Sequence, residues 1–555
     1  MVKYYCPHNI TMKYFTTKKI FFIPSYGIDV KETEKIDRFL ELLDKSGVFI
    51  IFNEEKKNSS QGGRPTFNKY NMFAMILYCF AFSKASLRDI EDLCKFDLRI
   101  IYIMENETPC YVTISNFINE YIVPNRDFIF STITKSIFDE CNIAMDTAFV
   151  DGSKFEANSN KYKFVWKPTT YHIKLSDKIR KLLNAYDLGR GIPNDGIIDS
   201  RLIANKLVEF SALLDKESDK KVRKDFDSLS EYLNKSLEYE EKERICGPNR
   251  NSYYKTDHDA TAMCLKNDYY SGLGSNMHAA YNCQLMVIHG FITDYFVSQS
   301  RNDINDFIPL IDKHYEMYQS YPENVTADSG YGSLDNYEYM DNHGITNYVK
   351  HQSWQGNVSG KNPLCYEIND DDTITCLNGN IGYQTTIVGR HPKKANAIFY
   401  RIDGCNTCPF STYCKRFMKD KTQDYKIFEV IVQLSKYIKQ SEENLLSPKG
   451  IEMRVNRSIQ VEGAYGVIKQ DFMYERFRRI SINKVTAEFM LVCLGFNIRK
   501  LFRFFNGKSK FDYWTAPSNL KAETKKKPSA KRLINKVNKK SNKSINEVAK
   551  KHKYK

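Results

Sequence analysis

The sequence predicts an α/β protein whose core is a mixed sheet with helices on its faces. Between residues 144 and 349, short strand-like runs alternate with helical stretches. Two long segments interrupt the core: one is charged and helical, and the other is rich in Gly, Cys and short alternating runs. We expect an N-terminal helical region at 1–140, a core at 141–350 and 436–510, a helical insertion at 165–255, a β-rich insertion at 351–435 and a basic tail at 515–555.

The N-terminal region contains the longest apolar run, Met72–Phe82. It is far shorter than the roughly 20 residues that a membrane-spanning helix needs, so it predicts a buried core helix. Ser86-Leu-Arg-Asp89 resembles a capping box at the start of a helix. A second helical pattern opens at Thr113, and Pro124 is expected to end it. Two successive short helices fit either a DNA-binding helix-turn-helix or any small helical domain.

The core elements follow in order along the chain. Ala144–Ala157 is strand-like and contains Asp151, and the runs on either side of His289-Gly290 predict a hairpin. A helix, a strand, a second helix and a further strand should follow, at about 303–319, 324–327, 333–343 and 346–349. In the helical insertion, a repeat of apolar residues every three or four positions predicts one buried stripe, formed by Val222, Phe226, Leu229, Leu233 and Leu237.

Three acids stand at meaningful points of this pattern. Asp151 lies on a predicted strand, Asp328 ends another, and Glu462 lies in a helical segment. Catalytic and ligand-binding groups favour the carboxyl ends of strands in α/β sheets. Carboxylates suit hard cations such as Mg²⁺ or Mn²⁺, and a pair of these ions can catalyse phosphoryl transfer on DNA. Taken singly, an Asp-Gly or Asp-Ser-Gly sequence is equally a turn or an exposed acid.

Basic residues follow the third acid. Lys469 comes seven residues after Glu462, on the same helical face, where it would contact DNA phosphate or remain a solvated surface lysine. Arg476, Arg478 and Arg479 widen this basic face.

Most of the net charge lies in the tail. The chain carries +15, and residues 518–555 hold 14 Lys or Arg against Glu523 and Glu547, which gives +12. This segment has few apolar residues and is expected to be a disordered basic arm. Its partner would be a polyanion bound through counterion release, unless the arm serves only solubility.

The 14 cysteines suggest a reduced, cytoplasmic protein, because Met1–Thr16 lacks the apolar stretch of a secretory signal. Cys405 and Cys408 form a CxxC, and with Cys376 and Cys414 they could complete a structural Zn²⁺ site. Cys365 competes with Cys376 for a place in this set. Free thiols are the main alternative, and a disulfide is the least expected.

Several segments that follow one another along the chain resemble those of DDE-type insertion-sequence transposases of bacteria. These enzymes are members of the RNase H-like superfamily of transposases and integrases. The resemblance covers almost everything before the basic tail. The segments that carry it are Gly63–Pro65, Pro109–Ile114, Asp151–Asn160, Thr256–Ala260, Tyr281–Gln284, Ala327–Tyr331 and Arg457–Lys469.

The resemblance implies an RNase H-like catalytic core in which Asp151, Asp328 and Glu462 bind two Mg²⁺ or Mn²⁺ ions. Such an enzyme cuts transposon ends and joins them to target DNA. Its partners would be the DNA of the transposon ends, the target DNA and a second copy of the chain, and no membrane partner is expected. The enzyme would lie in the cytoplasm, close to the nucleoid. The alternatives are an RNase H-like DNA nuclease without strand transfer and a domesticated, non-catalytic DNA-binding protein.

The chain departs from the related signature at three positions. Relatives carry Arg four residues before the catalytic Glu, whereas here Ser458 holds that place and Arg457 lies one residue earlier. Val455 stands at the tyrosine position of the signature, and Tyr111 stands where a histidine is expected. Arg457 is still counted among the expected DNA-binding residues, with Lys469 and the three later arginines.

Overall fold

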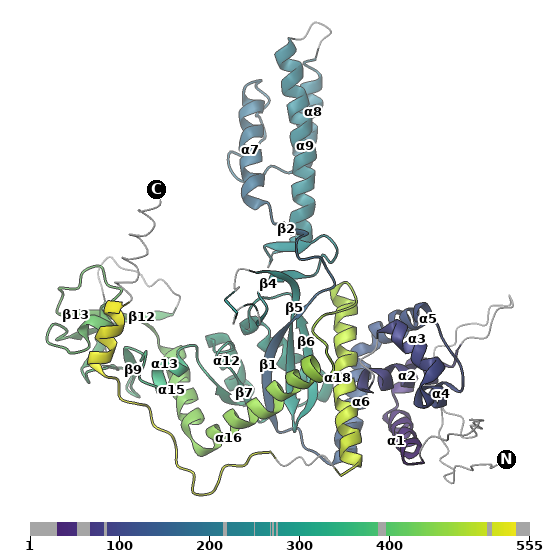
Figure 1. Ribbon diagram of the computed structural model, residues 1–555. Helices are drawn as coiled ribbons and strands as arrows, with labels where there is room; N and C mark the ends of the chain where they lie inside the picture. Colours follow the sequence, from purple (N-terminus) through teal and green to yellow (C-terminus); the bar gives the residue numbers. More distant parts are fainter. Residues whose placement is uncertain are drawn as a thin grey trace, which may run out of the picture.

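A computed structural model describes most of the chain (Figure 1). The Gly63–Pro65 segment and the last residues of the basic tail lie outside the described residues. Among the described residues, no helix is both long and apolar enough to cross a membrane. The described ranges are 30–52, 67–82, 86–214, 219–248, 250–266, 268, 271–272, 276–386, 396–507 and 513–539.

The N-terminal helices pack on the rest of the molecule without a break in the core. α2 (Lys69–Phe82) is buried along most of its length, as predicted, and packs against α18 (Ile482–Phe505). The capping box of Ser86 and Asp89 is present at the start of α3. The other elements are α1 (Val30–Ser46), η1 (Val48–Phe52), α3 (Leu87–Phe96) and α4 (Leu98–Met104).

The prediction that Pro124 ends a helix is wrong. α5 (Tyr111–Phe117), the π-helical turn η2 (Ile118–Ile122) and α6 (Val123–Cys141) follow one another without a gap, and Pro124 lies in the first turn of α6. A proline inside an α-helix clashes with the carbonyl four residues earlier. The wider π turn just before it changes that spacing, which explains why the helix continues.

The core is a curled, mixed six-stranded sheet in the order β4-β5-β1-β7-β8, and β6 also pairs with β5, on the edge opposite β1. β1, β7 and β8 are parallel, and β5 is antiparallel to β1, β4 and β6. This mixed α/β arrangement agrees with the predicted fold class and is compatible with an RNase H-like core. The strands are β1 (Thr147–Glu156), β4 (Thr261–Met263), β5 (His278–Ile288), β6 (Phe291–Ser298), β7 (Asn324–Ala327) and β8 (Thr346–Val349).

Helices cover this sheet. α18 packs on β6, and α16 (Pro448–Arg457) crosses β1, β7 and β8. α11 (Phe307–Tyr318) packs on β6 after the short turn η3 (Asp303–Asn305), and α12 (Leu334–Asn342) packs on β8.

The predicted hairpin joins β5 and β6. His289 and Gly290 both have positive φ, 48° and 72°, which fits a two-residue hairpin turn. The amide of Gly290 donates to Oε1 of Gln460 at 2.7 Å. The turn therefore fixes the segment that carries Glu462 to the end of the sheet.

The helical insertion projects away from the sheet as an arm (Figure 1). It has a small core of its own, with Leu229 buried and Val222, Phe226 and Leu233 packed around it. Leu237, expected in the same stripe, is 49% exposed. The arm consists of α7 (Thr169–Asn184), α8 (Ser200–Ser211) and α9 (Lys220–Cys246), and a ribbon of β2 (Phe164–Trp166) and β3 (Ser252–Tyr254) forms its base.

The second insertion is a five-stranded sheet in the order β13-β12-β11-β10-β9, built on a separate small core. α15 (Val432–Leu446) leads the chain from it back to the main sheet. Its elements are α13 (Trp354–Val358), β9 (Tyr366–Ile368), β10 (Ile374–Cys376), β11 (Ile381–Gln384), β12 (Ala397–Asp403), α14 (Ser411–Cys414) and β13 (Tyr425–Ile431).

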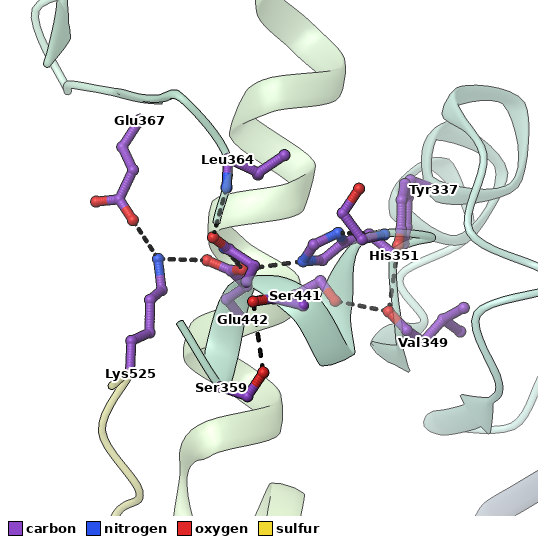
Figure 2. A network of polar contacts seen from close by, with 12 residues as sticks. Tyr337, Val349, His351, Ser359, Leu364, Glu367, Ser441, Glu442 and Lys525 are labelled. Atoms are coloured by element: carbon purple, nitrogen blue, oxygen red, sulfur yellow. Dashed lines mark hydrogen bonds and ion pairs between the residues drawn. The ribbon is translucent and has the colours of Figure 1, made fainter. Parts of the chain in front are cut away.

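The described part of the tail is not a disordered arm. It passes the part of the molecule that carries the main sheet, and its last described residues, 530–539, form a short helix beside the β-rich insertion (Figure 1). Lys525 forms ion pairs with Glu442 at 2.5 Å and with Glu367 (Figure 2). Glu442 is 3% exposed and is also hydrogen-bonded to His351 at 2.9 Å. A buried carboxylate needs a partner charge, and Lys525 supplies it and anchors the tail.

Candidate active site

Asp151 lies on β1, and Asp328 directly follows the neighbouring parallel strand β7. The β1–β7 register pairs Phe149 with Thr326. Asp151 lies two residues after Phe149, and Asp328 lies two residues after Thr326. Because strand side chains alternate with a period of two, the two carboxylates leave the sheet on the same face. The sheet therefore brings together the first two predicted acids.

Glu462 reaches this edge from a helix. It ends the π-helical turn η4 (Ser458–Glu462), and the hydroxyl of Ser458 donates to its Oε2 at 3.0 Å. Tyr465, in α17 (Gly463–Gly466), donates its hydroxyl to the carbonyls of Asp151 at 3.1 Å and of Cys283 at 2.6 Å. These bonds tie the helix to β1 and β5, and so they bring Glu462 near enough to Asp151 for their charges to interact.

Arg457 joins two of the acids. Its Nη2 lies 2.5 Å from Oε1 of Glu462, and its Nη1 lies 3.5 Å from Oδ1 of Asp151. The π turn explains how an arginine five residues before Glu462 can do this. In an α-helix, residues four apart share a face, whereas a π turn bonds residues five apart. The one-residue departure from the related signature is thus compensated in space, and Arg457 meets Glu462.

The electrostatics of Asp151 reflect this crowding. Burial, together with the charges of Asp328 and Glu462, raises the pKa of Asp151 to about 7, although Arg457 and the Gly152 amide oppose the shift. The pKa of Lys350 is lowered, mainly by burial and also by Arg457 and Arg454. The carboxylates would therefore gain from an additional positive charge.

The donor set fits a hard divalent cation by its chemistry and charge. In the part of the chain that the structure describes, no three His, Cys, Asp or Glu side chains stand close enough together to hold a metal ion. The positive group next to both Asp151 and Glu462 is the guanidinium of Arg457. For these two acids to share a metal ion, that guanidinium has to move.

Lys469 is held within the protein. It lies in the π turn η5 (Val467–Asp471), and its Nζ donates to the hydroxyl of Ser153 at 2.7 Å and to the carbonyl of Lys154 at 2.9 Å. It also lies 4.5 Å from the centre of the Phe155 ring. Lys469 is therefore not a fully solvated surface lysine but fixes the helix to β1, and its contact with DNA phosphate stays a prediction.

The three arginines that follow differ in exposure. Arg476 and Arg478 are exposed, whereas Arg479 is half-buried and donates from Nη1 to Asn119 at 2.8 Å. Burial lowers the pKa of Arg479. Contact of the first two with DNA stays a prediction, and the third joins the segment after η5 to the N-terminal helices.

Sequence reasoning missed a fourth carboxylate beside the site, Asp303. It accepts hydrogen bonds from Asn282 at 2.7 Å and from Gln284 at 2.8 Å, the two amides of the Tyr281–Gln284 motif. The sequence alone predicts no function for the two amides of this motif. The only signal in the sequence was an aspartate at the start of the helical segment that follows the predicted hairpin.

The cysteines of the β-rich insertion lie close to one another. Cys376, Cys405, Cys408 and Cys414 line one cavity of about 20 Å³. Backbone amides two residues later donate to the sulfurs of Cys376 and Cys408, each at 3.4 Å. Cys365 shares a hydrogen bond with Cys414, and this bond, despite burial, lowers the pKa of Cys365. The described cysteines are free thiols, and a bound zinc ion stays a prediction.

Comparison with known proteins adds one finding. Residues 375–502 match a family model described as a transposase DDE domain. The matched segment contains Glu462 and Arg457, and it confirms the resemblance to DDE-type transposases. No curated protein and no solved structure matches the chain.

Proposed function

We propose that the chain is a DNA transposase that cuts transposon ends and joins them to target DNA by metal-dependent phosphoryl transfer. The family match supports a transposase-type enzyme. Two observations support the finer proposal: the β1–β7 register sets Asp151 beside the end of the strand that precedes Asp328, and Arg457 contacts both Asp151 and Glu462. A non-catalytic DNA-binding protein would not need Asp151 to be buried within reach of the charges of Asp328 and Glu462, which is energetically costly.

In this proposal, Asp151, Asp328 and Glu462 hold two Mg²⁺ or Mn²⁺ ions. When bound, these ions would align the attacking oxygen with the scissile phosphate and neutralise the charge that develops there. Arg457 would exchange its contacts with Asp151 and Glu462 for a DNA phosphate, since a guanidinium binds carboxylates and phosphates with the same geometry. Ser153 and Lys469 would keep β1 fixed to the helix that carries Glu462.

The test uses DNA ends taken from the regions that flank the gene. Asp328→Asn preserves the size of the side chain and removes its charge, so we expect loss of cleavage with end binding largely intact. The matched control is Asp341→Asn, an exposed acid that accepts a hydrogen bond from Tyr437 at 2.9 Å and should leave cleavage unchanged. Near wild-type Mg²⁺-dependent cleavage by Asp328→Asn would reject the assignment.

A strand-transfer assay separates a transposase from a nuclease on the same core. Wild-type protein, given a pre-cut end and a target plasmid, should yield joined products. Two ends must be paired, so we also propose that a homodimer forms on DNA.

A further inference from the structure

We infer that Asp303 is a positioning residue for Asp151 and Asp328, and that it acts together with Gln284 and Tyr331. The inference rests on the proposed function, because it concerns the same site. It assigns a role to the Tyr281–Gln284 motif and to the loop between β6 and α11.

Two amides fix the direction of the Asp303 carboxylate. Its Oδ1 accepts hydrogen bonds from Nδ2 of Asn282 at 2.7 Å and from Nε2 of Gln284 at 2.8 Å. Both amides belong to β5, and the register sets Gln284 directly opposite Gly152 of β1. The carboxylate is therefore held against the strand that carries Asp151.

The carboxylate lies against two glycines that flank the proposed catalytic acids. A Cβ added at Gly152, next to Asp151, would lie 2.6 Å from Oδ1 of Asp303. A Cβ added at Gly330, two residues after Asp328, would lie 3.4 Å from Oδ2. β1 and β7 are paired only as far as Phe149 and Thr326. Asp303 thus fills the space beyond that point, between β1 and the Asp328 loop.

A hydrogen-bonded chain connects the Asp328 loop to this carboxylate. Tyr331, three residues after Asp328 and fully buried, donates its hydroxyl to Oε1 of Gln284. Gln284 is also fully buried, and its Nε2 donates to Asp303 and, at 3.3 Å, to Asp306. Because both ends of the amide are used, its orientation is fixed, and the position of the loop depends on the position of Asp303.

The charges of the site converge on Tyr331. Burial first, and then the charges of Asp303, Asp151 and Asp328, raise the pKa of the Tyr331 hydroxyl. Three carboxylates therefore surround one buried ring, and the network sets their spacing. Groups that orient metal-binding carboxylates in this way change metal affinity by about 10–100-fold when they are removed.

The first test measures Mn²⁺ binding to the protein alone by electron paramagnetic resonance. We expect Asp303→Asn to weaken binding by roughly 10-fold or more, because the loss of charge loosens the Asp328 loop. Gly152→Ala should weaken it too, since it displaces the carboxylate while leaving Asp303 in the chain. The control is Asp312→Asn, an exposed acid on α11 that accepts the Tyr339 hydroxyl and should bind Mn²⁺ as the wild type does.

The second measurement is the Mn²⁺ concentration that gives half-maximal cleavage. Asp303→Asn should raise it by the same factor and largely keep the rate at saturating Mn²⁺. A purely structural role would instead lower the melting temperature without shifting the metal dependence. Unchanged Mn²⁺ binding in both Asp303→Asn and Gly152→Ala, with binding lost in Asp328→Asn, would overturn this inference and leave the proposed function standing. Wild-type protein without Mn²⁺ binding or cleavage would overturn both.

Discussion

At the scale of single residues, the sequence shows which acids lie on or directly after a strand, but it does not show where an arginine on an irregular helix turn will point. Asp151 and Asp328 could be placed together from the strand pattern before them, and the β1–β7 register agrees. Arg457 could not be placed, because counting with α-helical spacing misses the π turn at Ser458–Glu462. Asp303 was missed since its contacts to β5 are non-local.

Arg457 should control the pH dependence of catalysis. The pKa of Asp151 is already raised to about 7, and the charge of Arg457 is the larger of the two influences that oppose this shift. In Arg457→Ala the pKa should rise further, so Asp151 would be protonated up to a higher pH. We expect the rising limb of the cleavage pH profile, at fixed Mg²⁺, to move to higher pH. A profile that loses amplitude without moving would contradict this role.

Asp151 should also reduce stability when it is ionised. In the unfolded chain its pKa is near the ordinary value of 3.8, and in the folded protein it is about 7. Between these values the folded state binds the extra proton, so stability falls as pH rises through this range. Without divalent metal, Asp151→Asn should therefore melt at a higher temperature than the wild type at pH 8.

The difference in melting temperature between Asp151→Asn and the wild type should shrink as the pH falls towards 4, because the folded-state carboxyl is then protonated and the unfolded chain begins to take up the same proton. A constant difference across this pH range would show that ionisation of Asp151 is not the cause. Asp341→Asn serves as the control for a general effect of removing one acid.

At the scale of elements, periodicity predicted the parts that are regular. The hairpin around His289-Gly290 and the strand at 324–327 were both found, because alternation and a two-residue turn leave clear marks. Pro124 misled, since the preceding π turn has no recognised sequence signal. In the arm, Leu237 follows the apolar repeat but lies beyond the small core that Leu229 forms.

The β-rich insertion offers a test of metal binding. Its own core is small, so a Zn²⁺ ion held by Cys376, Cys405, Cys408 and Cys414 would add stability. Elemental analysis of purified protein should find about one zinc per chain, the occupancy of a single tetrahedral site. Cys405→Ser with Cys408→Ser should lose it. Metal-free protein with a folded insertion would reject the zinc prediction and leave the carboxylate site untouched, because the two sites use different ligands.

At the scale of the whole molecule, α18 unites the N-terminal helices with the sheet in one continuous core, while the arm and the β-rich insertion have cores of their own. The composition predicted that the tail is basic, but it did not predict which parts of the protein the tail contacts. Lys525 and Glu442 are far apart in sequence, and nothing local to either residue shows that they pair. The described part of the tail is anchored by Lys525 and also by Glu523, which pairs with Arg454 at 2.7 Å.

The tail should bind DNA through its charge. Lys361 and the tail residues Lys531, Arg532 and Lys539 line a cavity of about 720 Å³ beside the β-rich insertion. Deleting residues 518–555 should weaken binding similarly for all DNA sequences and flatten its dependence on salt. Lys525→Ala, which removes one anchoring contact and only one charge, should reduce the salt slope far less. An unchanged slope in the deletion would show that the tail makes no phosphate contacts.

The account depends most directly on one measurement, the joining of a pre-cut transposon end to target DNA in the presence of Mn²⁺, with sequencing of the junctions. Wild-type protein should produce junctions at the 3′ end of the transposon strand. Glu462→Gln, which keeps the shape of the side chain and removes the charge of the third acid, should bind the same DNA and produce none. Equal joining by wild-type protein and Glu462→Gln would contradict the claim that these three carboxylates form the active site.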